Sequence, residues 1–185
     1  MRSMKRIACL ALVLASLAIA APAAHASSYF LLGIGPRPGA GGELGDVVDG
    51  DSRSVRFGAG QRIGPIGLEG TAFGADLVGT GGDGFTRGRE YSTLSVAGDL
   101  KGFFPVLGPI EIFGKAGLNY TWVNGNDYSG SGWDLGGGAQ FVLELPLGYA
   151  AVWVDYTYQN LGLSDDTRDI DGSLDMVMVG VSLGL

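Results

Sequence analysis

The ionisable side chains that could carry chemistry recur on alternate positions of extended segments. Between Ile110 and Trp122 the polar positions include Glu111 and Lys115, and the positions between them are apolar or small. Side chains of a strand alternate between its two faces, so such a run predicts one apolar and one polar face. Nine ionisable residues, four basic and five acidic, fall on polar faces of this kind: Arg56, Arg62, Glu69, Asp99, Lys101, Glu111, Lys115, Glu144 and Asp155. This near-balance predicts ion pairs, because an unpaired buried charge costs several kcal/mol.

These residue types do not indicate a catalytic centre. The only histidine, His25, and the only cysteine, Cys9, lie in the first 26 residues, which we expect to be removed. The remainder lacks the groups for Ser-His or Cys-His nucleophiles and for His-ligated metals. The acidic stretch 165–172 departs from an EF-hand loop, which would require Glu at the position of Met178. We therefore predict no enzymatic activity, no cofactor and no metal site.

The first 26 residues have the layout of a cleavable signal peptide. A basic start precedes an apolar run from Ile7 to Ala21, and Ala24 and Ala26 supply the small residues of a cleavage site. The apolar run is shorter than the ~20 residues that a membrane-spanning helix needs. We expect cleavage after Ala26 and one domain over residues 27–185. Three of the 12 basic residues and none of the 19 acidic residues lie in this segment, so the domain is strongly acidic. That charge argues against nucleic acid as a partner.

Eight segments of the expected domain alternate as β-strands do. They are 29–35, 53–63, 66–78, 90–104, 109–123, 132–145, 148–160 and 174–185. Short connections at 64–65, 105–108 and 146–147 alternate with longer, polar ones at 36–52, 79–89, 124–131 and 161–173. Short turns on one side, long loops on the other and an even strand count are typical of outer-membrane barrels. The pattern predicts an all-β, eight-stranded antiparallel up-and-down transmembrane barrel with both termini on the periplasmic side.

Alternation alone does not say which face of the barrel is outside. A soluble lipocalin-type barrel has the same period with its apolar face inward. Aromatic residues on the apolar face gather toward strand ends, as they do at membrane interfaces: Phe104, Tyr120, Trp122, Trp133, Tyr156 and Tyr158. Together with the balanced charges they favour a polar lumen and a lipid-facing exterior. Trp153 falls on the lumen face, where we expect it to fill space.

Over the whole expected domain the chain resembles the small OmpA-like outer-membrane β-barrel proteins. Its last seven residues, from Val179, are similar to that family's C-terminal assembly signal, with Gly180, Leu183 and Leu185 at the positions that the insertion machinery would read. The family usually has aromatic residues where this chain has the two leucines. The resemblance implies an outer-membrane location, contact with membrane lipid and lipopolysaccharide, and the barrel-assembly machinery as a partner during biogenesis. No peptidoglycan-binding domain is expected to follow the last strand.

The expected role is non-enzymatic: envelope integrity, or surface interaction through the four long loops, whose ligand the sequence does not identify. Two alternatives stay open. One is a narrow gated ion pathway through the charged lumen, which the resemblance permits. The other is a soluble periplasmic lipocalin-like carrier. Side chains fill the lumen of an eight-stranded barrel, which argues against a wide pore.

Overall fold

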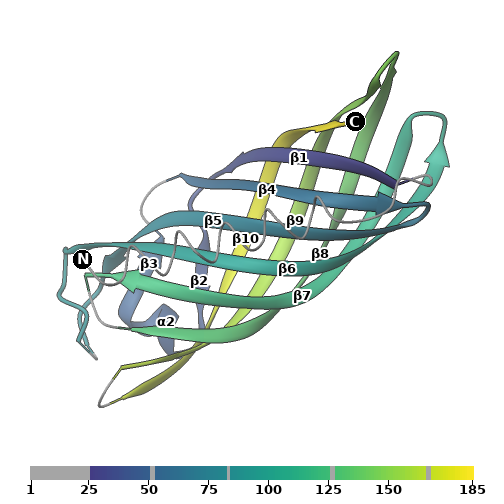
Figure 1. Ribbon diagram of the computed structural model, residues 1–185. Coiled ribbons are helices and arrows are strands. Elements are labelled where there is room, and N and C mark those ends of the chain that lie inside the picture. Colours follow the sequence, from purple (N-terminus) through teal and green to yellow (C-terminus); the bar gives the residue numbers. More distant parts are fainter. Residues whose placement is uncertain (1–25, 51–52, 83, 126–127, 166–167) are drawn as a thin grey trace.

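Eight long antiparallel strands close on themselves into a barrel in the computed structural model, which describes residues 26–50, 53–82, 84–125, 128–165 and 168–185 (Figure 1). The strands are β1 (Ala26–Gly35), β4 (Ser54–Ile63), β5 (Ile66–Gly79), β6 (Glu90–Leu107), β7 (Ile110–Asn124), β8 (Ser129–Leu145), β9 (Gly148–Ser164) and β10 (Asp169–Gly184). Neighbours in this order pair with each other, and β1 pairs with β10 to close the ring. The predicted fold is confirmed. The predicted signal segment, with Ala24 of its cleavage site, lies outside the described residues apart from Ala26.

Burial alternates along the strands and places the apolar face outside. On β6, the Leu100 side chain is 57% exposed, whereas its neighbours Asp99 and Lys101 are 3% and 6% exposed. On β7, Leu118 is 73% exposed and Lys115 is 4% exposed. Leucines on the outside and charges on the inside reverse the usual order of a protein dissolved in water. The arrangement matches a barrel whose wall faces lipid and is the opposite of a soluble carrier's. The described residues contain no helix that is long and apolar enough to span a membrane.

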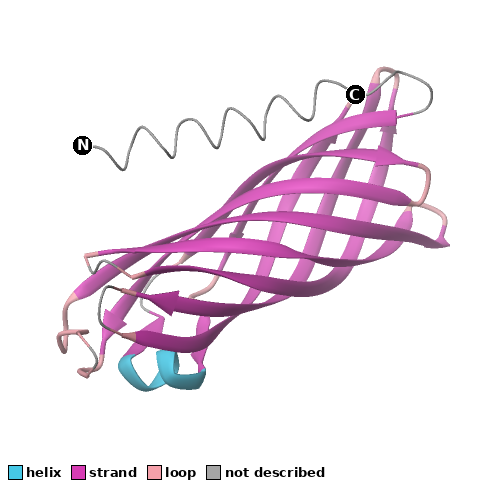
Figure 2. Ribbon diagram, turned by 60° about the horizontal axis from the view of Figure 1, so that its bottom comes forward, coloured by secondary structure: helices cyan, strands magenta, loops and turns pink. Residues whose placement is uncertain are grey.

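The described part of the first long connection, residues 36–50, contains regular secondary structure, whereas the sequence predicts a long polar loop there. It contains β2 (Gly39–Gly41), the short helix α2 (Gly42–Val47) and β3 (Val48–Gly50). β2 pairs with β10 and β3 pairs with β5, so the segment spans the loop end of the barrel (Figure 2). A six-residue helix is too short to form by propensity and forms here by packing. Its contribution to the core is two side chains, Leu44 and Val47, which are too few to show a helical period in the sequence.

The last two strands also extend further toward the loop end than predicted. β9 continues to Ser164 and β10 begins at Asp169, so most of the predicted loop 161–173 is paired strand. In this extension Leu161 and Leu163 are 1% exposed, whereas the alternate residues Gly162 and Ser164 are exposed. The apolar face is therefore inside at this end and outside in the rest of the wall. This reversal indicates that the extension stands in water beyond the lipid.

Candidate functional site

The barrel interior divides into an apolar part and a charged part. The apolar part lies toward the loop end, where Phe85 stacks on Tyr128 at 5.6 Å between ring centroids and meets Tyr91 edge-on at 4.9 Å. It also contains Phe73, Leu77, Val123, Leu161, Leu163, Ile170, Leu174, Met176 and Met178, with Leu44, Val47 and Val48 of the first connection. The charged lumen predicted from alternation therefore occupies only the part nearer the turns. Apolar side chains fill the loop end, and the same cluster continues among the charged groups with Phe103, Phe113 and Trp153.

Asp155 is the centre of the first ion-pair group in the charged part. Its Oδ2 lies 2.6 Å from Arg56 Nη1 and 3.1 Å from Lys115 Nζ. Arg56 also donates a hydrogen bond to the Thr157 hydroxyl at 3.2 Å. The three charged side chains are at most 3% exposed, so one buried carboxylate serves two buried cations.

A second group forms around Glu69. Its Oε2 accepts hydrogen bonds from Lys101 Nζ at 3.1 Å and from the Tyr29 hydroxyl at 2.9 Å. Lys101 Nζ also lies 4.0 Å from the centre of the Phe113 ring, a cation–π contact. The ammonium group is thus held between a carboxylate and an aromatic face, away from water.

A third pair closes the turn end. Arg62 and Glu111 form two parallel hydrogen bonds of 2.8 and 2.9 Å, and Gln140 donates a third to Glu111 at 2.7 Å. The two charged side chains are 20% and 15% exposed, so water reaches this pair. Bidentate pairing of this kind fixes geometry as well as charge.

Two of the nine predicted lumen residues lie outside these groups. Glu144 is exposed near the turn between β8 and β9, which corrects its prediction as a lumen residue. Glu144 does lie on the polar face of β8, but it stands near the end of that strand, beyond the enclosed part of the barrel. Asp99 is buried in the lumen and forms none of the salt bridges above. Its neighbour is Asp134, 2% exposed, a residue on the polar face of β8 that the predicted set omitted.

Trp153 fills the lumen beside two glycines. A Cβ atom on Gly33 would collide with Trp153 Cη2, and one on Gly180 would collide with Trp153 Cζ2 and with the backbone oxygen of Leu32. The indole therefore occupies the space that side chains at these positions would take. Gly180, predicted as part of the assembly signal, faces inward against Trp153, whereas Leu183 and Leu185 are 58% and 79% exposed.

Replacing Gly180 by alanine is expected to lower the free energy of unfolding by about 1–3 kcal/mol, because the added methyl overpacks the contact with Trp153. Urea unfolding of the refolded barrel measures this. The matched control is Gly98→Ala, where a Cβ meets nothing within 4 Å and the change should stay within about 0.5 kcal/mol. If both variants unfold like the wild type and only Gly180→Ala inserts poorly in cells, the glycine serves assembly and not packing.

The predicted aromatic residues lie at two levels of the outer wall. Tyr120 and Trp122 are in ring contact at 4.6 Å near the end of β7, and Trp133 and Tyr158 at 5.5 Å across β8 and β9. The Tyr156 hydroxyl donates to Asp175 on the neighbouring strand. These five lie toward the loop end, and Phe104, which is 60% exposed, lies toward the turns. Amphipathic rings at such levels suit a membrane interface.

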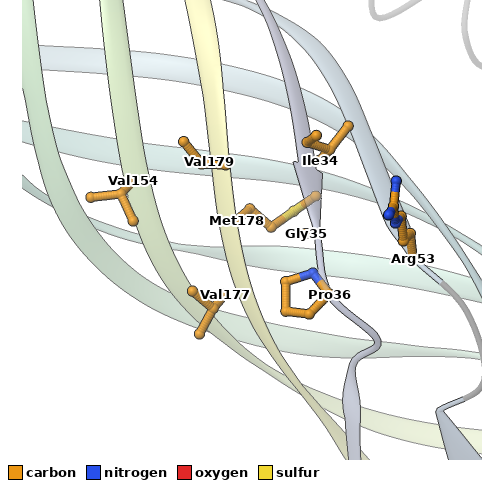
Figure 3. A pocket seen from close by; sticks show the side chains of 8 residues that line it. All are labelled: Ile34, Gly35, Pro36, Arg53, Val154, Val177, Met178 and Val179. Carbon is orange, nitrogen blue, oxygen red and sulfur yellow. The ribbon is translucent and has the colours of Figure 1, made fainter.

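The cavities in the described part of the barrel are small or open outward. A void of about 10 Å³ lies in the lumen among Tyr29, Lys101, Phe103 and Trp153, room for about one water molecule. A groove of about 280 Å³ lies on the outer wall, where the pairing of β1 with β10 stops after Ile34 (Figure 3). Its lining is apolar apart from Arg53 at one end, and Met178 reaches toward Gly35 at its base. Neither space forms a continuous passage.

Solved structures share this architecture, although no protein-family model matches the chain and no curated protein matches it in sequence. The structure of Neisserial surface protein A superposes with a TM-score of 0.56 and 15% identity over 88% of this chain and 99% of that one. Ail, the attachment invasion locus protein of Yersinia pestis, gives 0.50 and 14% over 88% and 100%. A major outer membrane protein of Thermus thermophilus gives 0.50 and 13% over 86% and 99%. At these identities the likeness concerns the fold, and it agrees with the resemblance stated from the sequence. The chain has the fold of the small outer-membrane β-barrel proteins.

Proposed function

We propose that the protein is an integral outer-membrane barrel without enzymatic activity, which contributes to the envelope or presents its loop end to a partner. The observation that carries the proposal is the filled interior beneath an exposed apolar wall. Buried ion pairs occupy one part of the lumen, an apolar core occupies the other, and α2 with its two flanking strands covers the loop end. A closed body of this kind supports contact at its rim better than transport through its axis.

The membrane location is tested by fractionation. We expect the protein in the outer-membrane fraction, extractable only with detergent, and migrating faster on gels when it is not boiled. Its partners there would be lipid and lipopolysaccharide, with the barrel-assembly machinery during insertion. Recovery from the periplasm without detergent would favour the soluble carrier instead.

Surface proteolysis of intact cells tests the orientation. Cleavage confined to the connections at 36–53, 80–89, 125–128 and 165–168 would support an exposed loop end. Ail has also been solved in complex with sucrose octasulfate, a heparin analogue. Exposed side chains at the described loop end are more often acidic than basic in this chain: Glu43, Asp46, Asp49, Asp76, Glu90, Asp169 and Asp171 against Arg37, Arg53, Arg87, Arg89 and Arg168. This balance favours neutral or cationic partners over a polyanion.

The ion-pathway alternative has the buried charges in its favour and the apolar part of the interior against it. We expect no steady unitary current from the purified protein in planar bilayers, because packed apolar side chains fill the loop-end part of the lumen. Steady currents in the wild type that disappear in Lys115→Ala or Glu111→Ala would establish conduction through the lumen and would replace the closed-barrel proposal.

A further inference from the structure

The most deeply buried charges of the lumen do not balance. Ionisable side chains of the described interior that are at most 6% exposed comprise three bases and four acids: Arg56, Lys101, Lys115, and Glu69, Asp99, Asp134, Asp155. The salt bridges described above use all three bases with Glu69 and Asp155. The Arg62–Glu111 pair is neutral in itself. With all four carboxyl groups ionised, one negative charge is in excess, and it lies with Asp99 and Asp134. Isolated buried charge is costly, so either a bound cation or a proton must neutralise it.

Asp99 and Asp134 face each other across a glycine. Asp99 of β6 pairs with Gly117 of β7, which pairs in turn with Asp134 of β8. Gly117 places no side chain between them, and Asp99 Oδ1 lies directly against the place that a Cβ of Gly117 would take. The neighbouring cation, Lys115, is bound to Asp155 at 3.1 Å.

Buried side-chain oxygen atoms at and around these two carboxyl groups also lack hydrogen-bond donors. Asp99 Oδ1, both oxygens of Asp134, Asn119 Oδ1 and Gln159 Oε1 are buried and accept no hydrogen bond from any described residue. Gln159 of β9 stands directly opposite Asp134, and Asn119 stands two residues from Gly117 on the same face of β7. The four side chains are 2–4% exposed. Register thus places Asp99, Asp134 and Gln159 in one row across β6 to β9, and Asn119 two residues further toward the loop end.

We propose that Asp99, Asp134, Asn119 and Gln159 bind one hard monovalent cation, such as Na⁺, inside the barrel. One positive charge balances the excess, whereas a divalent ion would reverse it. Carboxylate and carbonyl oxygens are the ligands that hard cations prefer. A proton shared by the two aspartates would leave both amide oxygens without a partner. Among the described residues no group of three or more acidic, His or Cys side chains could hold a metal ion, and the donor set proposed here has two carboxylates beside two amides. The site is independent of the role proposed for the loops.

The test uses the full barrel, refolded in detergent separately in sodium chloride and in choline chloride at equal ionic strength. Refolding in each salt allows the ion to enter, since the finished barrel is closed. We expect the midpoint of unfolding in urea to rise with sodium concentration and to saturate, as for a ligand bound only by the folded state. Sodium NMR of the folded protein gives a second readout that does not depend on unfolding. Equal midpoints in the two salts would overturn the proposal.

Three variants distinguish a bound cation from a shared proton and from a general effect of salt. Asp134→Asn removes the excess charge and should abolish the sodium response while raising the midpoint in choline. Gln159→Met keeps the charge but removes an oxygen ligand, and should raise the sodium concentration for half-maximal response at least about tenfold. Glu111→Gln makes the same carboxylate-to-amide change outside the site and should leave the response intact. An unchanged response in Gln159→Met would remove Gln159 from the site. An infrared band of a protonated carboxyl that disappears in Asp134→Asn would assign a shared proton and overturn the proposal.

Discussion

Replacing Glu69 by leucine is expected to lower the barrel's free energy of unfolding by about 3–5 kcal/mol. The substitution removes the only salt-bridge partner that Lys101 has among the described residues, and the lysine side chain is 8% exposed. It also leaves the Tyr29 hydroxyl, now 2.9 Å from Glu69, without its acceptor. Most of the loss comes from the stranded ammonium group and not from the attraction itself, because pairing of buried charges barely offsets their desolvation. Urea unfolding of the refolded barrel in lipid vesicles measures the change.

A second substitution separates these two contributions. Lys101→Met in the Glu69→Leu background removes the stranded charge and should restore stability to within about 1–2 kcal/mol of the wild type. Glu111→Gln is the matched control, because its partner Arg62 is 20% exposed and can turn to water. Its cost should be about 1 kcal/mol or less. A double variant as unstable as Glu69→Leu alone would mean that the carboxylate supports the wall in some way other than by pairing.

The part of the fold that lies in the membrane could be predicted from the sequence because one rule governs it throughout. Wherever lipid covers the outside and charges line the inside, apolar and polar residues alternate along each strand. On β6, Leu100 between Asp99 and Lys101 is enough to show which positions face lipid and which face the lumen. All eight wall strands followed from this alternation, and on β4 to β9 it also gave the face that carries the charged residues. The closing pair β1–β10 followed from the need to leave no backbone edge in lipid.

The rule that apolar positions face outward fails at the loop end, because the outside of the barrel there faces water and not lipid. Leu161 and Leu163 point inward while the outer positions face water, so the same period continues with its apolar face reversed. In the sequence that reversal looks like the end of a strand. The secondary structure of residues 39–50 could not be predicted from the sequence for a related reason. Leu44 is held by its contact with β10, beside Gly172, which is a property of the closed barrel and not of the segment.

Alternation shows which residues lie on the polar face of a strand, but it does not show which of them are enclosed in the lumen. Glu144 and Asp134 both occupy the polar face of β8, and nothing in their neighbours along the chain ranks one above the other. Their positions in the folded barrel distinguish them. Asp134 stands opposite Gly117 in the middle of the wall, and Glu144 stands beside Tyr149 at the last turn. Strand order and register determine which charges meet, and alternation supplies neither.

Replacing Leu100 by arginine is expected to lower the free energy of unfolding in lipid vesicles by about 2–4 kcal/mol. Leu100 is 57% exposed, lies on the outer face of β6 and stands between the aromatic level of Phe104 and that of Tyr120, so the charge would enter the hydrocarbon core. The matched control is Leu107→Arg on the same strand. Leu107 is 74% exposed beyond Phe104, where the cost should fall to about 0–1 kcal/mol.

The comparison of these two arginine variants tests the lipid-facing wall directly. On a barrel dissolved in water, both leucines would be ordinary exposed positions, and either substitution would change stability by about 0.5 kcal/mol at most. A depth-dependent difference therefore requires an apolar medium around β6, and its size reports how far Leu100 lies from the interface. Equal, small costs for both variants would contradict the membrane location, whatever the interior contains. Equal, large costs would instead place Leu107 inside the hydrocarbon and move the periplasmic boundary beyond the turn.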